Sequence, residues 1–96
     1  MPAAYIIADV TVTDAEKMAE YRVWSSRAMQ EFGAEVLVRG GESEVLEGPW
    51  APGRLVMLKF PSRERVQASS TSEIYTHARS LREGAGVIDI VCVEGA

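Results

Sequence analysis

The chain has 96 residues, of which 47% are hydrophobic and 25% are charged. These values are typical of one globular domain, and they exclude both two separate cores and a disordered chain. The 14 acidic residues outnumber 10 scattered basic ones, and the resulting net charge of −4 argues against a nucleic-acid partner.

The first residues carry neither a basic region nor a long apolar run, so we expect no signal peptide, no membrane span and a cytoplasmic location. The single cysteine, Cys92, excludes an internal disulfide. Its neighbours Ile-Val-Cys-Val predict a buried strand position rather than a reactive thiol. A domain this small often gains stability by covering a sheet face with a partner, so we expect a homo-oligomer.

The first third of the chain predicts a strand and then a helix. The strand runs over residues 4–12, and Thr13 is expected to cap a helix, with Glu16 completing a capping box. Gly33 is expected to end the helix. One arc of this helix carries mostly apolar side chains, and its members are Met18, Tyr21, Ser25, Ala28, Met29 and Phe32. Trp24 lies at the edge of this arc.

The middle of the chain predicts a hairpin. A strand is expected over residues 34–40, followed by a bend or bulge at Gly40-Gly41 and a further extended stretch over 43–47. A turn is expected over 48–53 and a return strand over 54–60. Two apolar runs separated by glycine and proline are typical of paired antiparallel strands.

The last third predicts a broken helical region and a final strand. Pro61 ends the return strand and Ser62 is expected to cap a helix. A second helix over residues 71–83 is indicated by the pair Ser70 and Glu73, with Gly84 after its end, and the last strand covers 87–93.

This order of elements predicts an α+β, ferredoxin-like domain: a four-stranded antiparallel sheet in the order fourth, first, third, second strand, with the helices on one face. Alternation assigns one residue of each strand to the helix side: Ala8, Val38, Leu58 and either Ile88 or Ile90. The same alternation assigns four charged residues to the open side: Asp9, Arg39, Lys59 and Asp89. This charged set is interpreted either as a solvated or salt-bridged sheet face or as the floor of a polar pocket.

Several blocks of the sequence resemble an uncharacterised family known as the domain of unknown function DUF1330. They are Ala-Tyr-Ile-Ile-Ala-Asp-Val at the start, Glu20-Tyr21, Val38-Arg39-Gly40-Gly41, Val45-Leu46-Glu47-Gly48 before Trp50, Pro52-Gly53-Arg54-Leu55-Val56, Phe60-Pro61-Ser62 and Ser72-Glu73-Ile74-Tyr75. The resemblance spans nearly the whole chain. It implies a dimeric α+β barrel, in which two sheets pack face to face.

Proteins with that fold include cofactor-independent antibiotic-biosynthesis monooxygenases, muconolactone isomerase, chlorite dismutase and stress-responsive barrel proteins. The fold therefore does not name a reaction. The family offers no agreed catalytic residues. Members usually carry aromatic residues where this chain has Ser69-Ser70, which implies a wider or more polar pocket if that site lines one.

Three residues are the catalytic candidates. Tyr21 offers a phenol, Arg39 an oxyanion-binding guanidinium and His77, the only histidine, a general base. Each has a structural alternative: core packing for Tyr21, a salt bridge to a hairpin glutamate for Arg39 and a surface position for His77. One histidine and one cysteine in separate elements favour no metal site, and no phosphate loop is present, so we expect no cofactor.

The substrate-binding candidates are Asp9, Trp24, Trp50, Arg54 and Tyr75. Trp24 and Trp50 would be pocket walls, although Trp24 also fits core packing and Trp50 also fits a subunit contact. Arg54 would hold a carboxylate or enolate oxygen together with Arg39, or would form a salt bridge to a glutamate of the hairpin, Glu42, Glu44 or Glu47.

Two functional hypotheses follow. The first is an enzyme without a cofactor, an oxygenase, isomerase or cyclase that acts on a compact or aromatic small molecule. The second is a non-enzymatic ligand-binding or interaction module, since no acid, base and nucleophile form a recognisable set. In both, we expect a homodimer through the open sheet face and no membrane partner.

Overall fold

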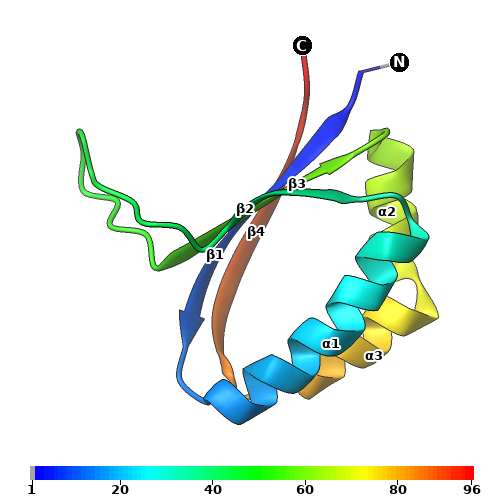
Figure 1. Cartoon of the computed structure of the whole chain (residues 1–96), viewed down its shortest axis with the longest axis horizontal. Helices are drawn as coiled ribbons and strands as arrows, with labels where there is room; N and C mark the ends of the chain where they lie inside the picture. The colour runs from blue at the N-terminus through cyan, green and yellow to red at the C-terminus, as the bar shows by residue number, and fades with distance from the viewer. Residues whose placement is uncertain (1) are drawn as a thin grey trace.

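The structure is a computed structural model that describes residues 2–96 (Figure 1). Its elements are β1 (Ala4–Val12), α1 (Ala15–Glu31), β2 (Glu35–Arg39), β3 (Arg54–Phe60), α2 (Arg63–Thr71), α3 (Glu73–Leu81) and β4 (Gly86–Glu94). The strands form one antiparallel sheet in the order β2-β3-β1-β4, and the helices lie on one of its faces. The predicted ferredoxin-like fold is therefore confirmed. No helix in the described part of the chain is long and apolar enough to cross a membrane.

Two of the three predicted helix caps were misplaced by one or two residues. Asp14, not Thr13, caps α1, because its carboxylate accepts a hydrogen bond from Lys17 N at 3.1 Å. Ser62 caps α2 as predicted. Ser72, not Ser70, caps α3 by accepting a hydrogen bond from Tyr75 N at 3.2 Å. The helical region therefore breaks at Ser72, and Ser70 stays inside α2.

A bulge in β2 overturns part of the predicted sheet alternation. Val36 lies opposite Leu58, but Val38 lies opposite Met57 and Arg39 opposite Val56, so the register shifts between Val36 and Val38. The extra residue moves Arg39 to the face that the helices cover and Val38 to the open face. The prediction that Arg39 shares a face with Asp9, Lys59 and Asp89 is wrong for this reason.

The pairing of the strands also places no basic residue directly opposite Asp9 on the open face. Asp9 lies opposite Leu55 in β3 and Asp89 in β4, whereas Lys59 lies opposite Tyr5. Asp9 therefore has a like charge, not a lysine, as its cross-strand neighbour.

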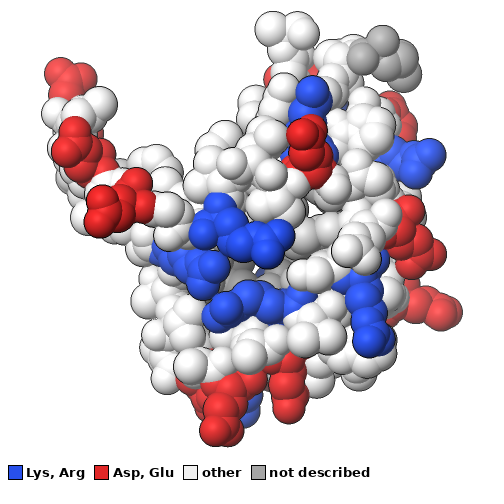
Figure 2. Space-filling model, viewed as in Figure 1, with Lys and Arg blue, Asp and Glu red and all other residues white. Residues whose placement is uncertain are grey.

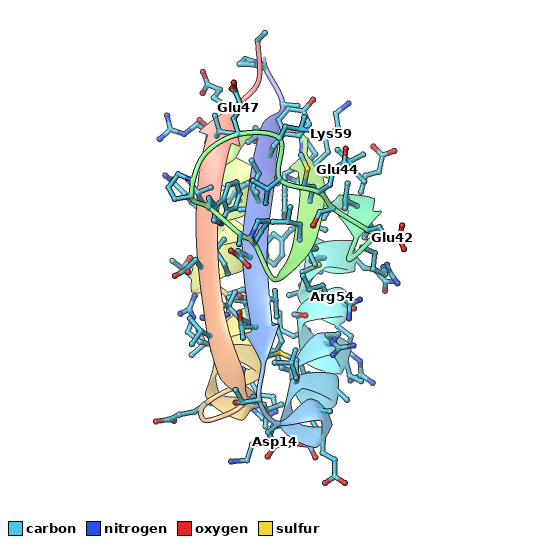
Figure 3. All side chains as sticks on the ribbon, turned by 90° about the vertical axis from the view of Figure 1, so that its left-hand side faces the viewer. Asp14, Glu42, Glu44, Glu47, Arg54 and Lys59 are labelled. Atoms are coloured by element: carbon cyan, nitrogen blue, oxygen red, sulfur yellow. The ribbon has the colours of Figure 1, made fainter. Side chains whose placement is uncertain are left out.

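The segment between β2 and β3, residues 40–53, contains no strand, and its residues 41–53 form a long arm; the extended stretch predicted over 43–47 is not part of the sheet. Residues 41–51 are all exposed, and Leu46 keeps 83% of its surface open to solvent. The arm extends away from the helices (Figure 1), and it lies in front of the open sheet face in Figure 3, where its glutamates Glu42, Glu44 and Glu47 are labelled.

The apolar core between sheet and helices consists of two separate clusters. The first joins the facing parts of α1 and α3 and includes Met18, Tyr21 and Tyr75. The second lies on β1, β3 and α2 and includes Leu58, Phe60 and Val66. Since the two clusters do not merge, space remains between the helices and the sheet.

Candidate functional site

A cavity of about 690 Å³ lies between the helices and the covered face of the sheet. Small side chains make this space: Ala8 lines it at the middle of β1, and Ser25, Ser26, Ser69 and Ser70 line it from the helices. The volume is within the range of known small-molecule sites. Ser69 and Ser70, where the family resemblance implied a change in the pocket, both belong to its wall.

Two tyrosines and one arginine form a hydrogen-bonded cluster in the cavity wall. The hydroxyls of Tyr21 in α1 and Tyr75 in α3 are 2.8 Å apart, and their rings meet edge to face. Arg82, just after α3, donates through one nitrogen, Nη1, to Tyr21 Oη at 3.4 Å and to Tyr75 Oη at 3.3 Å. Both tyrosines are buried, with 8% and 9% exposure. The cluster therefore presents fixed polar groups in the cavity wall.

The cluster contains more hydroxyl hydrogens than its own atoms accept. Two phenols carry two hydroxyl hydrogens, and the bond between Tyr21 and Tyr75 uses only one of them. Arg82 is a donor and cannot accept the other. Among residues 2–96 no further acceptor bonds either hydroxyl. One O–H thus remains to donate to an oxygen in the cavity.

Burial raises the pKa of Tyr21 well above its usual range, and the neighbouring Tyr75 adds to this rise, whereas Arg82 acts in the opposite direction. The phenol therefore stays protonated at neutral pH. Tyr21 is consequently a hydrogen-bond donor or acid in this site, and it is a poor general base.

Five arginines line the same cavity: Arg22, Arg39, Arg54, Arg79 and Arg82. Its lining contains no Asp, Glu, Lys or His. Figure 2 shows basic side chains gathered around a hollow at the centre of the molecule, with the acidic side chains placed farther out. The cavity therefore attracts anions although the whole chain is acidic.

The hairpin geometry brings Arg39 and Arg54 to the cavity. The β2 bulge turns Arg39 inward, and the alternation of β3 places Arg54 on the same face as Val56. Gly40 adopts a left-handed backbone with φ of +68°, and a Cβ at this position would overlap the Arg54 side chain. Glycine at position 40 thus allows the Arg54 side chain to lie across the backbone.

The structure brings four predicted site residues together at the cavity: Tyr21, Arg39, Arg54 and Tyr75. It does not bring His77 or Trp24 there. Their rings pack edge to face, 4.7 Å apart, on the α1–α3 surface, where His77 is exposed and neither residue lines the cavity. His77 follows Tyr75 by two positions and so lies on the other side of α3, whereas Trp24 lies about one turn beyond Tyr21 and packs at the edge of the first core cluster.

Asp9 and Trp50 lie on the other side of the sheet. The Asp9 carboxylate accepts hydrogen bonds from Trp50 Nε1 at 3.1 Å and from Gly53 N at 2.9 Å. These two contacts fasten the base of the arm to β1. Asp9 is thus an anchor for the arm, and neither it nor Trp50 lines the cavity.

Sequence reasoning missed three of the lining arginines, Arg22, Arg79 and Arg82. A signal was present for two of them, because Tyr75, Arg79 and Arg82 are spaced i, i+4 and i+7 and so share one helical face. Cys92 is also different from the prediction: it lies in β4 but is exposed and lines the cavity. Within residues 2–96, no three His, Cys, Asp or Glu side chains are grouped so that they could hold a metal ion.

The chain belongs to the family described as domain of unknown function (DUF1330), whose sequence model matches residues 3–96. Comparison with curated proteins gives no match. A protein of unknown function from Rhodopseudomonas palustris has a similar structure, with a TM-score of 0.80 and 17% identity over 99% of this chain and 83% of that one.

Two more distant structures show the same fold. SnoaB, a cofactor-independent oxygenase from Streptomyces nogalater, matches with a TM-score of 0.61 and 9% identity over 100% of this chain and 95% of that one. A dimeric protein of unknown function with a ferredoxin-like fold, from Bacteroides fragilis, matches with a TM-score of 0.58 and 13% identity over 96% and 95% of the two chains. At these identities the likeness shows the fold alone.

Proposed function

We propose that this DUF1330 protein binds a compact small molecule in the cavity and acts on an oxygen atom of it with Tyr21, Tyr75 and Arg82. The observation that carries this proposal is the 2.8 Å contact between the two phenols, which leaves one O–H free beside a guanidinium. Such a pair of donors suits an oxygen on which negative charge develops during a reaction.

Cofactor-independent oxygenation, isomerisation and cyclisation of a carbonyl compound can each proceed through an enolate or a similar oxyanion after the Cα proton passes to water, so one donor cluster would serve each of them. The protonated Tyr21 would donate to this oxygen, and the Arg82 guanidinium would stabilise its charge. The arrangement needs no bound organic cofactor. The shared fold with SnoaB, a cofactor-independent oxygenase, supports the oxygenase among these three by analogy.

One observation favours a second candidate function, a ligand-binding module without catalysis. The lining residues include no His, Asp, Glu or Lys, so the cavity supplies donors but no ready general base. His77, the base proposed from the sequence, lies outside the cavity. In this reading, the tyrosine cluster orients a ligand and does not transfer a proton.

A ligand screen by thermal shift, followed by product analysis, tests both. Hits that bind in the cavity should be lost in Ser26→Phe, which fills it, and kept in Val23→Phe, because Val23 is exposed on the same helix and does not line the cavity. Turnover by the wild type that falls in Tyr21→Phe and Tyr75→Phe supports the enzyme. Binding without turnover supports the module, and hits that Ser26→Phe retains contradict both.

We also propose that two copies of the chain pair through the open sheet face. That face carries exposed apolar side chains from β4, including Val87, Val91 and Val93 with exposures of 60%, 55% and 48%. Apolar strands left open to solvent are unfavourable and are usually covered. The arm stands in front of this face (Figure 3), so in such a pair it would lie against the second copy.

A further inference from the structure

We propose that the ligand of the cavity is an organic acid, held with its carboxylate among the arginines and its apolar body toward Phe60 and Val66. This inference rests on the proposed function, because it names the ligand class of the same cavity. It goes further in that it assigns both the charge of the ligand and its orientation.

The charge of the lining favours an anion. Five arginines line one cavity without any lining carboxylate, in a chain with 14 acidic residues. Among residues 2–96 the single ion pair joins Arg63 to Glu94, and neither of these lines the cavity. The salt bridges from Arg39 or Arg54 to the arm glutamates that the sequence suggested are therefore not formed. Like charges in one partly enclosed space repel each other, and a bound anion would remove this repulsion.

Two of the guanidiniums, those of Arg79 and Arg82, are already held in place by contacts within the protein. Arg79 Nη2 donates to Ser70 O at 3.2 Å and to Ser70 Oγ at 3.4 Å, and its guanidinium lies 4.9 Å from the centre of the Tyr75 ring. Arg82 uses one nitrogen for both tyrosines and lies over the Tyr21 ring. Since each guanidinium has five N–H groups, several donors on each remain for a ligand. Donors held in advance lose less entropy on binding.

Both apolar and polar side chains line the cavity. The second core cluster forms the apolar end of the cavity with Leu58, Phe60 and Val66, which are 3%, 3% and 8% exposed. The arginines and the free phenol O–H belong to the remaining wall. A molecule that matches both parts has one anionic group and an apolar body.

A carboxylate fits this wall better than a phosphate. Phosphate sites commonly use free backbone N–H groups at a helix start, but the first lining residue of each helix, Met18, Val66 or Tyr75, has its N–H bonded to Asp14 O, Ser62 O or Ser72 Oγ, respectively. The cavity offers guanidiniums, which bind carboxylates and phosphates alike through paired hydrogen bonds, so it is the lack of a backbone N–H site that favours the carboxylate.

Cys92 provides a direct test, because it is the single cysteine of the chain and lines the cavity. The rate at which the neutral reagent iodoacetamide alkylates it would be measured with benzoate, hexanoate, their neutral amides and phenyl phosphate. We expect the two carboxylates to slow alkylation, the amides to have little effect and added salt to weaken the protection. Arg54→Gln and Arg79→Gln should each weaken benzoate binding by about tenfold or more, and Arg63→Gln, outside the cavity, should not.

The remaining outcomes separate this inference from the proposed function. Equal protection by acids and amides, or protection by amides alone, would overturn the organic acid and leave a small-molecule site in place. Tighter binding of phenyl phosphate than of benzoate would overturn the carboxylate assignment. No protection of Cys92 by any of the charged or neutral probes would overturn both proposals. If one arginine variant does not fold, the other variant and the salt dependence still decide the question.

Discussion

The hydroxyl oxygens of Tyr21 and Tyr75 lie 2.8 Å apart although the residues are 54 positions apart in the chain. This contact connects α1 to α3 at the wall of the cavity, and Arg82 bonds to both oxygens. The stability of the helix layer and the chemistry of the cavity therefore depend on the same buried hydrogen bonds.

The first prediction is that Tyr21→Phe reduces the loss of stability at high pH. Burial keeps the folded-state pKa of Tyr21 above the ordinary value of 10.0. Below that value both the folded and the unfolded states are protonated, and the contribution of Tyr21 is fully present. Above it the unfolded chain releases the proton and the folded chain keeps it, so the free energy of unfolding falls as pH rises toward the folded-state pKa.

Urea unfolding of the wild type and Tyr21→Phe at about pH 8 and about pH 11 measures this effect. The variant should be less stable at the lower pH by about 1 kcal/mol, because Tyr75 loses a partner, and should lose less stability between the two conditions. Tyr5→Phe is the control, since Tyr5 lies on the open side of the sheet. Equal losses in the wild type and Tyr21→Phe would contradict the assignment.

The second prediction concerns the neighbouring glycines of the hairpin corner. Gly40→Ala places a Cβ in a left-handed backbone, at φ of +68°, and against the Arg54 side chain. We expect it to lower the free energy of unfolding by about 1–2 kcal/mol and to weaken carboxylate binding, because Arg54 must move. Gly41→Ala is the matched control: a Cβ there meets nothing within 4 Å, and the change should stay within about 0.5 kcal/mol.

The sequence allowed the fold to be predicted almost completely. Strand and helix patterns alternate clearly along the chain, and Gly33 is a strong local signal for the end of the first helix. The inner arc of α1 followed from its period, and Met18, Tyr21, Ser25 and Ala28 are indeed buried. Local patterns of this kind depend on neighbouring residues only.

The site could be predicted only in part, because it depends on details that span several elements. The single bulge in β2 moves Arg39 across the sheet, and the sequence indicated only a bend or bulge near Gly40. His77 lies two positions after Tyr75 and therefore on the other side of α3, and Trp24 packs against the first core cluster without lining the cavity. Asp9 was interpreted as a ligand contact because its partners Trp50 and Gly53 lie more than forty positions along the chain.

The third prediction is that Asp9 holds the arm. Asp9→Ala removes the acceptor for Trp50 Nε1 and for Gly53 N, and should cost about 1 kcal/mol or more of stability and release the arm. Cleavage by a glutamate-specific protease at Glu42, Glu44 and Glu47 should then become several-fold faster.

Asp89→Ala separates the role of Asp9 in anchoring the arm from a general effect of charge on the open face. Asp89 lies directly opposite Asp9 across β1 and β4, so either substitution removes the same like-charge repulsion. Only Asp9→Ala removes the hydrogen bonds to the arm. Stability should thus be unchanged or slightly higher in Asp89→Ala, and cleavage of the arm should be as slow as in the wild type; similar rapid cleavage in both variants would disprove the anchor.

The fourth prediction is that the open sheet face joins two chains. Val91 on that face and Val23 on the outer surface of α1 are almost equally exposed, at 55% and 53%, so each can be changed to lysine with a similar direct effect on the monomer. A lysine at the centre of an apolar interface would have to be desolvated without a partner, which costs several kcal/mol. Analytical ultracentrifugation at micromolar concentration should therefore find a dimer for the wild type and Val23→Lys and a monomer for Val91→Lys. A monomeric wild type, or a dimer that Val91→Lys leaves intact and Val23→Lys disrupts, would move the interface away from this face.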